Sequence, residues 1–193
     1  MIASAPDTAS RCAAELDLQM AGHLQRMLLP PPLFTANGWT AVHVFEPAGV
    51  VSGDYLDVVP FGDRVYFMLG DVSGKGVSAA LLMAQLHAMF RTLIPFQLPL
   101  SGLLSRASAL LCASSLPAQY ATLVAGYLAS GGEVVIGNAG HPPPLVIHGG
   151  RHTEVHATGL PIGMFCQAEF STTQLLLGPR DTKSAAPIRH RWA

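Results

Sequence analysis

Two aspartates beside apolar segments are the residues of this chain best suited to chemistry. Asp54 lies in VSGDYLDVV, residues 51–59, and Asp71 lies in GDVSGKG, residues 70–76. The apolar segments between them, 56–60 and 64–69, are joined by Phe61-Gly62-Asp63, a pattern typical of an antiparallel hairpin. Because the outer ends of a hairpin meet, we expect Asp54 and Asp71 to be neighbours in space.

Two adjacent carboxylates repel each other unless a cation lies between them. Both clusters offer hard oxygen ligands with no Cys or His nearby, a donor set that favours Mg²⁺ or Mn²⁺ over zinc. Asp57, in the same cluster as Asp54, is a further candidate ligand. The sequence therefore predicts a divalent metal site at the open end of the hairpin.

The turn after Asp71 is rich in glycine and leads into an apolar helix. Gly74 and Gly76 allow a tight turn and a close approach of backbone to ligand, and Ser78 is a candidate helix cap. The spacing is not that of a nucleotide-binding P-loop, because Gly76 and not Ser or Thr follows Lys75. Lys75 could attract a phosphoryl group, with a solvated turn lysine as the alternative, and an ordinary Asp-Gly connection is the alternative for the whole turn.

Histidines offer two weaker candidate sites. His141, in Asn138-Ala139-Gly140-His141, could act as a general acid near a leaving oxygen, but a Gly-His-Pro sequence also makes a plain turn with a hydrogen-bonded His. His152 and His156, with Glu154 between them, could chelate zinc on one strand face. A solvated hairpin face is the favoured interpretation of that trio.

Composition excludes several functional classes. The chain has 193 residues, of which 50% are hydrophobic and 12% charged, enough for one domain with a substantial core. A net charge of −1 without a basic run before the tail argues against nucleic-acid binding. We expect no membrane span and no signal peptide, because the longest apolar stretches are interrupted within a few residues.

The three cysteines, Cys12, Cys112 and Cys166, are far apart and odd in number. This pattern argues against a disulfide framework or a cysteine zinc site, and we expect reduced thiols in a cytoplasmic protein. No Cys-x5-Arg nucleophile loop and no Ser-His-Asp grouping can be picked out.

The elements expected to position the aspartates alternate hairpins with two apolar helices. Helices are predicted over 78–93 and 100–114, and a strand over 39–45. Further hairpins are predicted from 120–128 with 133–137 and from 145–148 with 151–156. Antiparallel hairpins that bracket helices indicate the α+β class.

An amphipathic helix is predicted over residues 13–29, after a disordered stretch of residues 1–12. Its apolar positions Leu16, Met20, Leu24 and Met27 recur at helical spacing before three prolines. This stripe either docks on the domain or forms the seam of a homodimer, and both alternatives bury it.

Six segments, in order, resemble the SpoIIE-type branch of the PPM metal-dependent serine/threonine phosphatases. They are LQRMLLP (24–30), FEPAGVVSGDYLDV (45–58), GDVSGKGVSAALLMA (70–84), YATLVAGYL (120–128), GNAGHPPPLVI (137–147) and GLPIGM (159–164).

The resemblance implies an αββα sandwich of two antiparallel sheets flanked by helices, and two bound Mn²⁺ or Mg²⁺ ions. By the family pattern Asp71 would bridge both ions, Asp54 would ligate the second, and the Val72 carbonyl would supply another ligand. Asp57, Gly74, Lys75 and His141 would be supporting positions. The implied substrate is a phosphorylated regulatory protein, an anti-sigma-factor antagonist.

The C-terminal segment departs from the family pattern. Family members continue into a strand that ends in Asp-Gly and then reach a further aspartate, and both of these aspartates bind metal. Here residues 175–182 resemble the approach to that strand, but the basic tail 183–193 follows. We therefore expect an incomplete phosphatase domain over 30–182 that lacks its last strand and helix. The alternative to an active phosphatase is a catalytically impaired binding module of the same shape.

Overall fold

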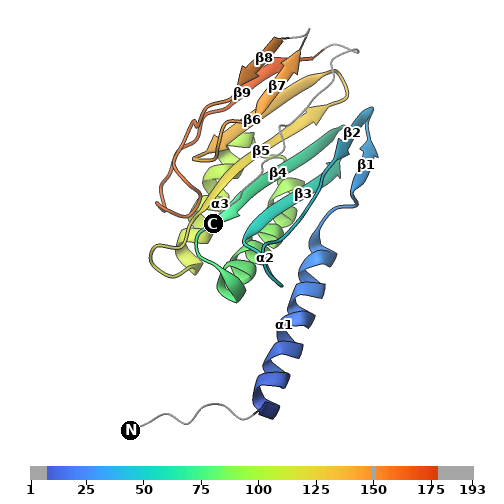
Figure 1. Ribbon diagram of the computed structural model, residues 1–193. Helices are drawn as coiled ribbons and strands as arrows, with labels where there is room; N and C mark the ends of the chain where they lie inside the picture. Colours follow the sequence, from blue (N-terminus) through green and yellow to red (C-terminus); the bar gives the residue numbers. More distant parts are fainter. Residues whose placement is uncertain (1–7, 149–150, 178–193) are drawn as a thin grey trace.

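The structure is a computed structural model, which describes residues 8–148 and 151–177. Its centre is a five-stranded antiparallel sheet in the order β3-β4-β5-β6-β9. The strands span Asp54–Phe61, Arg64–Val72, Ala121–Ala129, Glu133–Ala139 and Thr173–Leu176. The hairpins predicted over 56–69 and 120–137 are therefore confirmed, each longer than its apolar core suggested (Figure 1).

Two helices cover one face of this sheet (Figure 1). They are α2, Gly76–Leu93, and α3, Leu100–Ser114, linked through the short 3-10 helix η1, Ile94–Phe96. Alternate residues of β4, Tyr66 and Met68, point to the helices and join Leu86 and Phe90 in the main core. By length and composition Gly76–Phe96 could cross a membrane, but this packing is that of a core helix.

The other face of the sheet carries hairpins. The pair β1, Leu33–Ala36, with β2, Trp39–Val42, and the pair β7, Leu145–His148, with β8, Arg151–Glu154, form separate two-stranded sheets. Val124, Val134 and Ile136 form a smaller buried cluster on this side. The α+β class and antiparallel layering are confirmed, and the layer on this face consists of these two separate two-stranded sheets.

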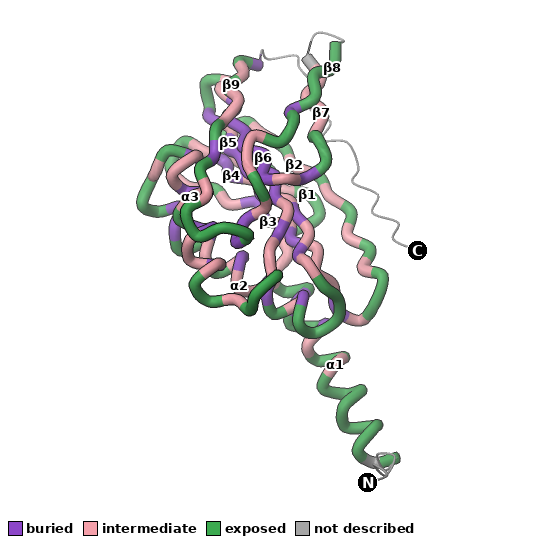
Figure 2. The backbone as a smooth tube through the Cα atoms, turned by 90° about the vertical axis from the view of Figure 1, so that its left-hand side faces the viewer, coloured by how far each residue is buried: buried purple, intermediate pink, exposed green. Residues whose placement is uncertain are grey.

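Helix α1, Thr8–Leu28, extends away from the body (Figures 1 and 2). Residues 8–12 are helical, so the prediction of disorder is wrong for them. Docking through the apolar stripe is also wrong, because Leu16, Met20, Leu24 and Met27 are 60–69% exposed. The helix instead meets the body through Gly22 and Gln25, both buried, and through Leu28, which packs on the main core.

Cys112 on α3 and Cys166 in the loop before β9 form a disulfide, with their Cα atoms 5.2 Å apart. The expectation of three reduced thiols is therefore wrong for this pair. The sequence argument relied on count and spacing, whereas the fold brings together two cysteines that are 54 residues apart. Cys12 is an exposed thiol on α1.

Candidate active site

Asp54 and Asp71 face each other across β3 and β4, in the register that the hairpin argument predicts. The Val72 amide donates to the Gly53 carbonyl at 3.3 Å, so the adjoining Asp54–Asp71 pair is of the kind that exchanges no backbone hydrogen bonds. In such pairs the Cα atoms lie about 4.5 Å apart and the side chains are closest. Both carboxylates are partly exposed and lie on the face away from α2 and α3.

The backbone beside this pair is tightly packed around Gly53. A Cβ atom on Gly53 would lie 3.1 Å from the Val72 carbonyl oxygen and 3.5 Å from Asp71 Oδ1. A side chain here would therefore press on the backbone and approach a candidate ligand. The Val72 carbonyl oxygen and Asp71 Oδ1 therefore both lie beside Gly53.

This donor set fits a hard divalent cation in type. Two carboxylates and one carbonyl are oxygen ligands of the kind that Mg²⁺ and Mn²⁺ prefer, and water would complete the roughly six positions that Mg²⁺ takes. Within residues 8–148 and 151–177 no group of three or more His, Cys, Asp or Glu side chains could hold a metal. The roles of Asp54, Asp71 and Val72 as ligands stay a prediction.

Asp57 does not belong to this site. It is three residues from Asp54, an odd spacing that turns its side chain to the opposite face of the strand. There it is fully buried and accepts hydrogen bonds from Arg91 Nε at 2.9 Å and Nη2 at 2.8 Å. The ligand prediction for Asp57 is wrong, since its charge is already neutralised by α2.

The surroundings of Asp57 shift the pKa values of its neighbours. Its hydrogen bonds raise the pKa of Arg91. Burial lowers the pKa of His87, whose Nδ1 lies 3.4 Å from Asp57 Oδ2. Burial also raises the pKa of Tyr55, which is fully buried and stacks on Phe90.

The glycine turn leads from Asp71 into α2. Gly74 and Gly76 have φ values of 98° and 67°, which favour glycine, and Lys75 between them is the exposed N-cap residue. The capping role expected of Ser78 is wrong, because Ser78 lies inside the helix and its Oγ is 3.2 Å from Gln119 Nε2. Lys75 is placed to meet an anion at the positive end of the helix dipole.

His141 is buried and lies close to the carboxylate pair. Its Nδ1 is 2.8 Å from Thr122 Oγ1, and Thr122 is the β5 residue opposite Asp71. The Asn138 side chain accepts from the His141 amide at 2.9 Å and donates to the His141 carbonyl at 3.0 Å. These contacts favour the hydrogen-bonded turn over a general acid.

The second histidine cluster lies at the surface. His156 Nε2 is 3.7 Å from Glu154 Oε2, and both side chains are more than half exposed. His152 on β8 is exposed as well. This arrangement matches the solvated hairpin face.

Ser52 contacts the candidate site and was not among the residues expected there from the sequence. Its hydroxyl donates to Asp54 Oδ2 at 2.7 Å and accepts from the Asp54 amide at 3.1 Å. A Ser two residues before an Asp commonly makes such a local bond, so the Ser-Gly-Asp sequence carried a signal.

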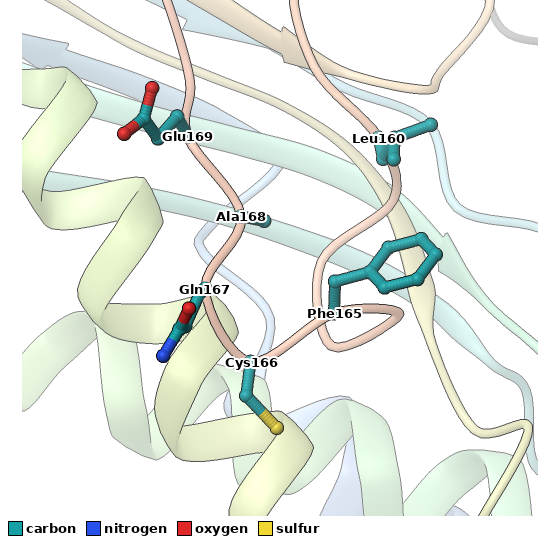
Figure 3. Close-up of a pocket in the computed structure, with 6 residues that line it drawn as sticks. All are labelled: Leu160, Phe165, Cys166, Gln167, Ala168 and Glu169. Atoms are coloured by element: carbon teal, nitrogen blue, oxygen red, sulfur yellow. The ribbon is translucent and has the colours of Figure 1, made fainter.

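A separate hollow of about 710 Å³ lies beside the loop that contains Cys166 (Figure 3). Its lining includes Leu160, Phe165 and Glu169, and neither Asp54 nor Asp71 contributes to it. The hollow is therefore distinct from the carboxylate pair. The same loop nevertheless reaches the central sheet, because Ile162 forms a β-bridge with Ala121, next to Thr122.

Comparison with known proteins gives a consistent result. The model of the family described as stage II sporulation protein E (SpoIIE) matches residues 62–183, a stretch that includes Asp71 and begins after Asp54. Protein IcfG of Synechocystis is 28% identical over an alignment of 194 positions, which covers 85% of this chain and 31% of that protein. The chain thus spans about a third of the length of this curated relative.

Solved structures show the same fold. The RsbU and RsbW domains of a Mycobacterium tuberculosis protein are 30% identical, with a TM-score of 0.59 over 68% of this chain and 38% of that one. The SiaA-PP2C domain of Pseudomonas aeruginosa is 18% identical, with a TM-score of 0.71 over 89% of this chain and 70% of that one.

Proposed function

The chain belongs to the SpoIIE family, and from that premise we propose that it is a metal-dependent phosphatase acting on phosphoserine or phosphothreonine of a regulatory protein. The observation that carries the proposal is the register of Asp54 opposite Asp71. Like charges placed directly opposite each other destabilise a sheet, and a shared cation removes that cost.

In this proposal each residue has a defined task. Asp71 and Asp54 hold the cations, and the Val72 carbonyl adds a third oxygen. Bound divalent ions supply an activated water and offset charge on the phosphoryl oxygens. Lys75, exposed at the start of α2, attracts the phosphoryl dianion, and Thr122 with His141 supports the strand beside Asp71. No covalent intermediate with the protein is required.

The proposed substrate is a phosphorylated anti-sigma-factor antagonist in bacterial signalling. Support comes from the resemblance and from the RsbU domain among the similar structures. A structure of RsbX in complex with magnesium supports Mg²⁺ or Mn²⁺ as the cofactor. A cytoplasmic location stays a prediction.

A second candidate function follows from the ligand count. Asp54, Asp71 and one carbonyl leave most of the coordination of two ions to water, so metal binding and turnover should be weak. The chain would then be a catalytically impaired binding module. Asp181, which could add a ligand, lies outside the described residues, as does the tail 183–193.

One assay separates the two candidates. The full chain is incubated with a phosphoserine peptide in Mn²⁺, in Mg²⁺ and in EDTA, and released phosphate is measured. A phosphatase releases phosphate only with metal, and an impaired module binds the phosphopeptide without releasing phosphate. Equal release in EDTA would refute the metal-dependent mechanism.

We also propose that a second copy of the chain covers the apolar stripe of α1. Leu16, Met20, Leu24 and Met27 recur every three or four residues, the spacing of a helix–helix seam, and are exposed.

A further inference from the structure

We propose that Gln25 of α1 is a positioning residue for Asp54 and acts through Ser52. This inference rests on the proposed function, because it gives Asp54 a metal to hold. The observations that carry it are four hydrogen bonds that run from α1 to the Asp54 carboxylate.

The first two bonds join Gln25 to the backbone of Ser52. Gln25 Nε2 donates to the Ser52 carbonyl at 2.7 Å, and the Ser52 amide donates to Gln25 Oε1 at 2.9 Å. A primary amide can do both at once, since it carries a donor and an acceptor. Gln25 is only 6% exposed, so both bonds are shielded from water.

The other two bonds join Ser52 to Asp54. The Ser52 hydroxyl donates to Asp54 Oδ2 at 2.7 Å, and the Asp54 amide donates to the same hydroxyl at 3.1 Å. The carboxylate is thereby held at one oxygen, Oδ2, and Oδ1 would remain as the ligand for a cation. Hydrogen bonds of this kind orient metal ligands, and their loss typically costs 10- to 100-fold in affinity.

The helix is brought close to this segment at Gly22. Any Cβ on Gly22 would meet the Val50 carbonyl oxygen, so only glycine permits this approach. Gly22 and Gln25 are three residues apart and share one face of the helix. Residues 50–52 are therefore packed on the face of α1 that carries Gly22 and Gln25, and Leu28, one turn further along, packs on the main core.

This choice of face argues for a role beyond helix docking. Burial of an amide gives little net stability even when it is fully bonded, whereas burial of a Leu or Met side chain stabilises a fold clearly. Yet α1 buries Gln25 and leaves Leu24 and Met27 exposed. What the amide provides, and a leucine could not, is a fixed position for Ser52 and so for Asp54.

The test uses Gln25→Ala and Ser52→Ala, with Ser52→Thr as the conservative variant. Gln19→Ala is the matched control, because Gln19 lies on the same helix and is exposed. Three quantities are measured on the full chain: the Kd for Mn²⁺ alone, the kcat and KM for a phosphoserine peptide, and the side-chain rotamer of Asp54 by NMR couplings in EDTA.

We expect Gln25→Ala and Ser52→Ala each to weaken Mn²⁺ binding about 10-fold. The double variant should lose little more, because both act on one chain of bonds. kcat should fall with KM unchanged, Ser52→Thr should keep most of the affinity, and Gln19→Ala should match the wild type.

The metal-free measurement separates this inference from the proposed function. Asp54 should hold one rotamer in the wild type and several in Gln25→Ala, whether or not the chain hydrolyses phosphate. If Gln25→Ala lowers the melting temperature but leaves the Asp54 rotamer and the Mn²⁺ Kd unchanged, Gln25 only docks the helix and the inference is overturned.

Discussion

Asp54 and Asp57 lie three residues apart on one strand but in opposite environments. Asp57 faces α2, is fully buried and is neutralised by two hydrogen bonds from Arg91. Asp54 faces the other side, is partly exposed and stands opposite a second carboxylate, Asp71. The same residue type therefore serves the fold on one face of the sheet and is available for chemistry on the other.

A strand separates these two roles through the alternation of its side chains. Strand alternation sends odd and even positions to different environments, so nearness in sequence to a site says little about membership in it. A carboxylate whose counter-charge lies inside the protein has a structural role, and its removal should change stability. Removal of a carboxylate that lies opposite another carboxylate should change metal binding instead.

The largest expected effect follows from Asp71→Asn. Removal of the charge proposed to bridge the metals should lower Mn²⁺-dependent turnover by orders of magnitude, since metal activation of water provides most of the rate. The matched variant Asp57→Asn, assayed where it is still folded, should retain turnover. Undiminished turnover in Asp71→Asn would remove the basis of the functional assignment.

The stability counterpart is Arg91→Met. This change leaves Asp57 buried without its cation, which should lower the free energy of unfolding by about 3–5 kcal/mol. Asp57→Asn should cost less, because the Arg91 side chain it leaves behind is 46% exposed and can be solvated. Urea unfolding in EDTA measures both, with Asp54→Asn as the near-neutral control. Equal losses of unfolding free energy in Asp54→Asn and Asp57→Asn would contradict the different roles assigned to the two aspartates.

Reduction of the Cys112–Cys166 disulfide should loosen the helical side of the molecule. Its loop of 54 residues corresponds to about 4 kcal/mol in the chain-entropy model. A lower melting temperature in dithiothreitol, absent in Cys112→Ser, is the expected result. The Cys12→Ser variant controls for the exposed thiol. Unchanged melting on reduction would mean that this link contributes nothing to stability.

A smaller effect is expected for the apolar stripe of α1. Leu24→Glu places a charge on the proposed seam between two copies and should halve the mass measured by light scattering. The melting temperature of the single chain should hardly change, because Leu24 is 60% exposed. A wild-type mass equal to one chain would contradict the dimer.

The smallest effect is a pH dependence at His87, which faces Asp57, Arg91 and Tyr55. Burial lowers its pKa in the folded state. As pH falls below about 6.5, the unfolded chain binds a proton that the folded chain resists, so stability is lost in acid and is fully present above that pH. Urea midpoints at pH 7.5 and 5.5 should differ less in His87→Gln than in the wild type. An identical pH slope would exclude His87 as the source.

Much of this could be predicted from local pattern. The β3–β4 hairpin and the meeting of Asp54 with Asp71 follow from two apolar runs and a short turn. The buried helices α2 and α3 follow from their continuous apolar composition. This prediction does not require knowing which sheet they pack against. These features depend on periods of two and of 3.6 residues, which the sequence displays directly.

The remaining features depend on long-range contacts. Asp57 lies close to Asp54 and Gly53 in the sequence, which suggests one cluster, but strand alternation places it on the opposite face. The disulfide joins residues 54 apart, and three cysteines do not reveal which two meet. The helix α1 docks through Gly22 and Gln25 against Val50 and Ser52, whereas its sequence pattern indicated contact through the apolar stripe.

The central claim is that the carboxylate pair, and not the helical face, holds the divalent cation. Mn²⁺ broadens NMR signals near its binding site, so a titration of the metal alone into the full chain locates that site even when binding is weak. We expect the amide signals of Gly53, Asp54 and Asp71 to broaden first and those of Asp57 and Arg91 to broaden later. First broadening at Asp57 or at His152, or no selective broadening at all, would contradict the claim.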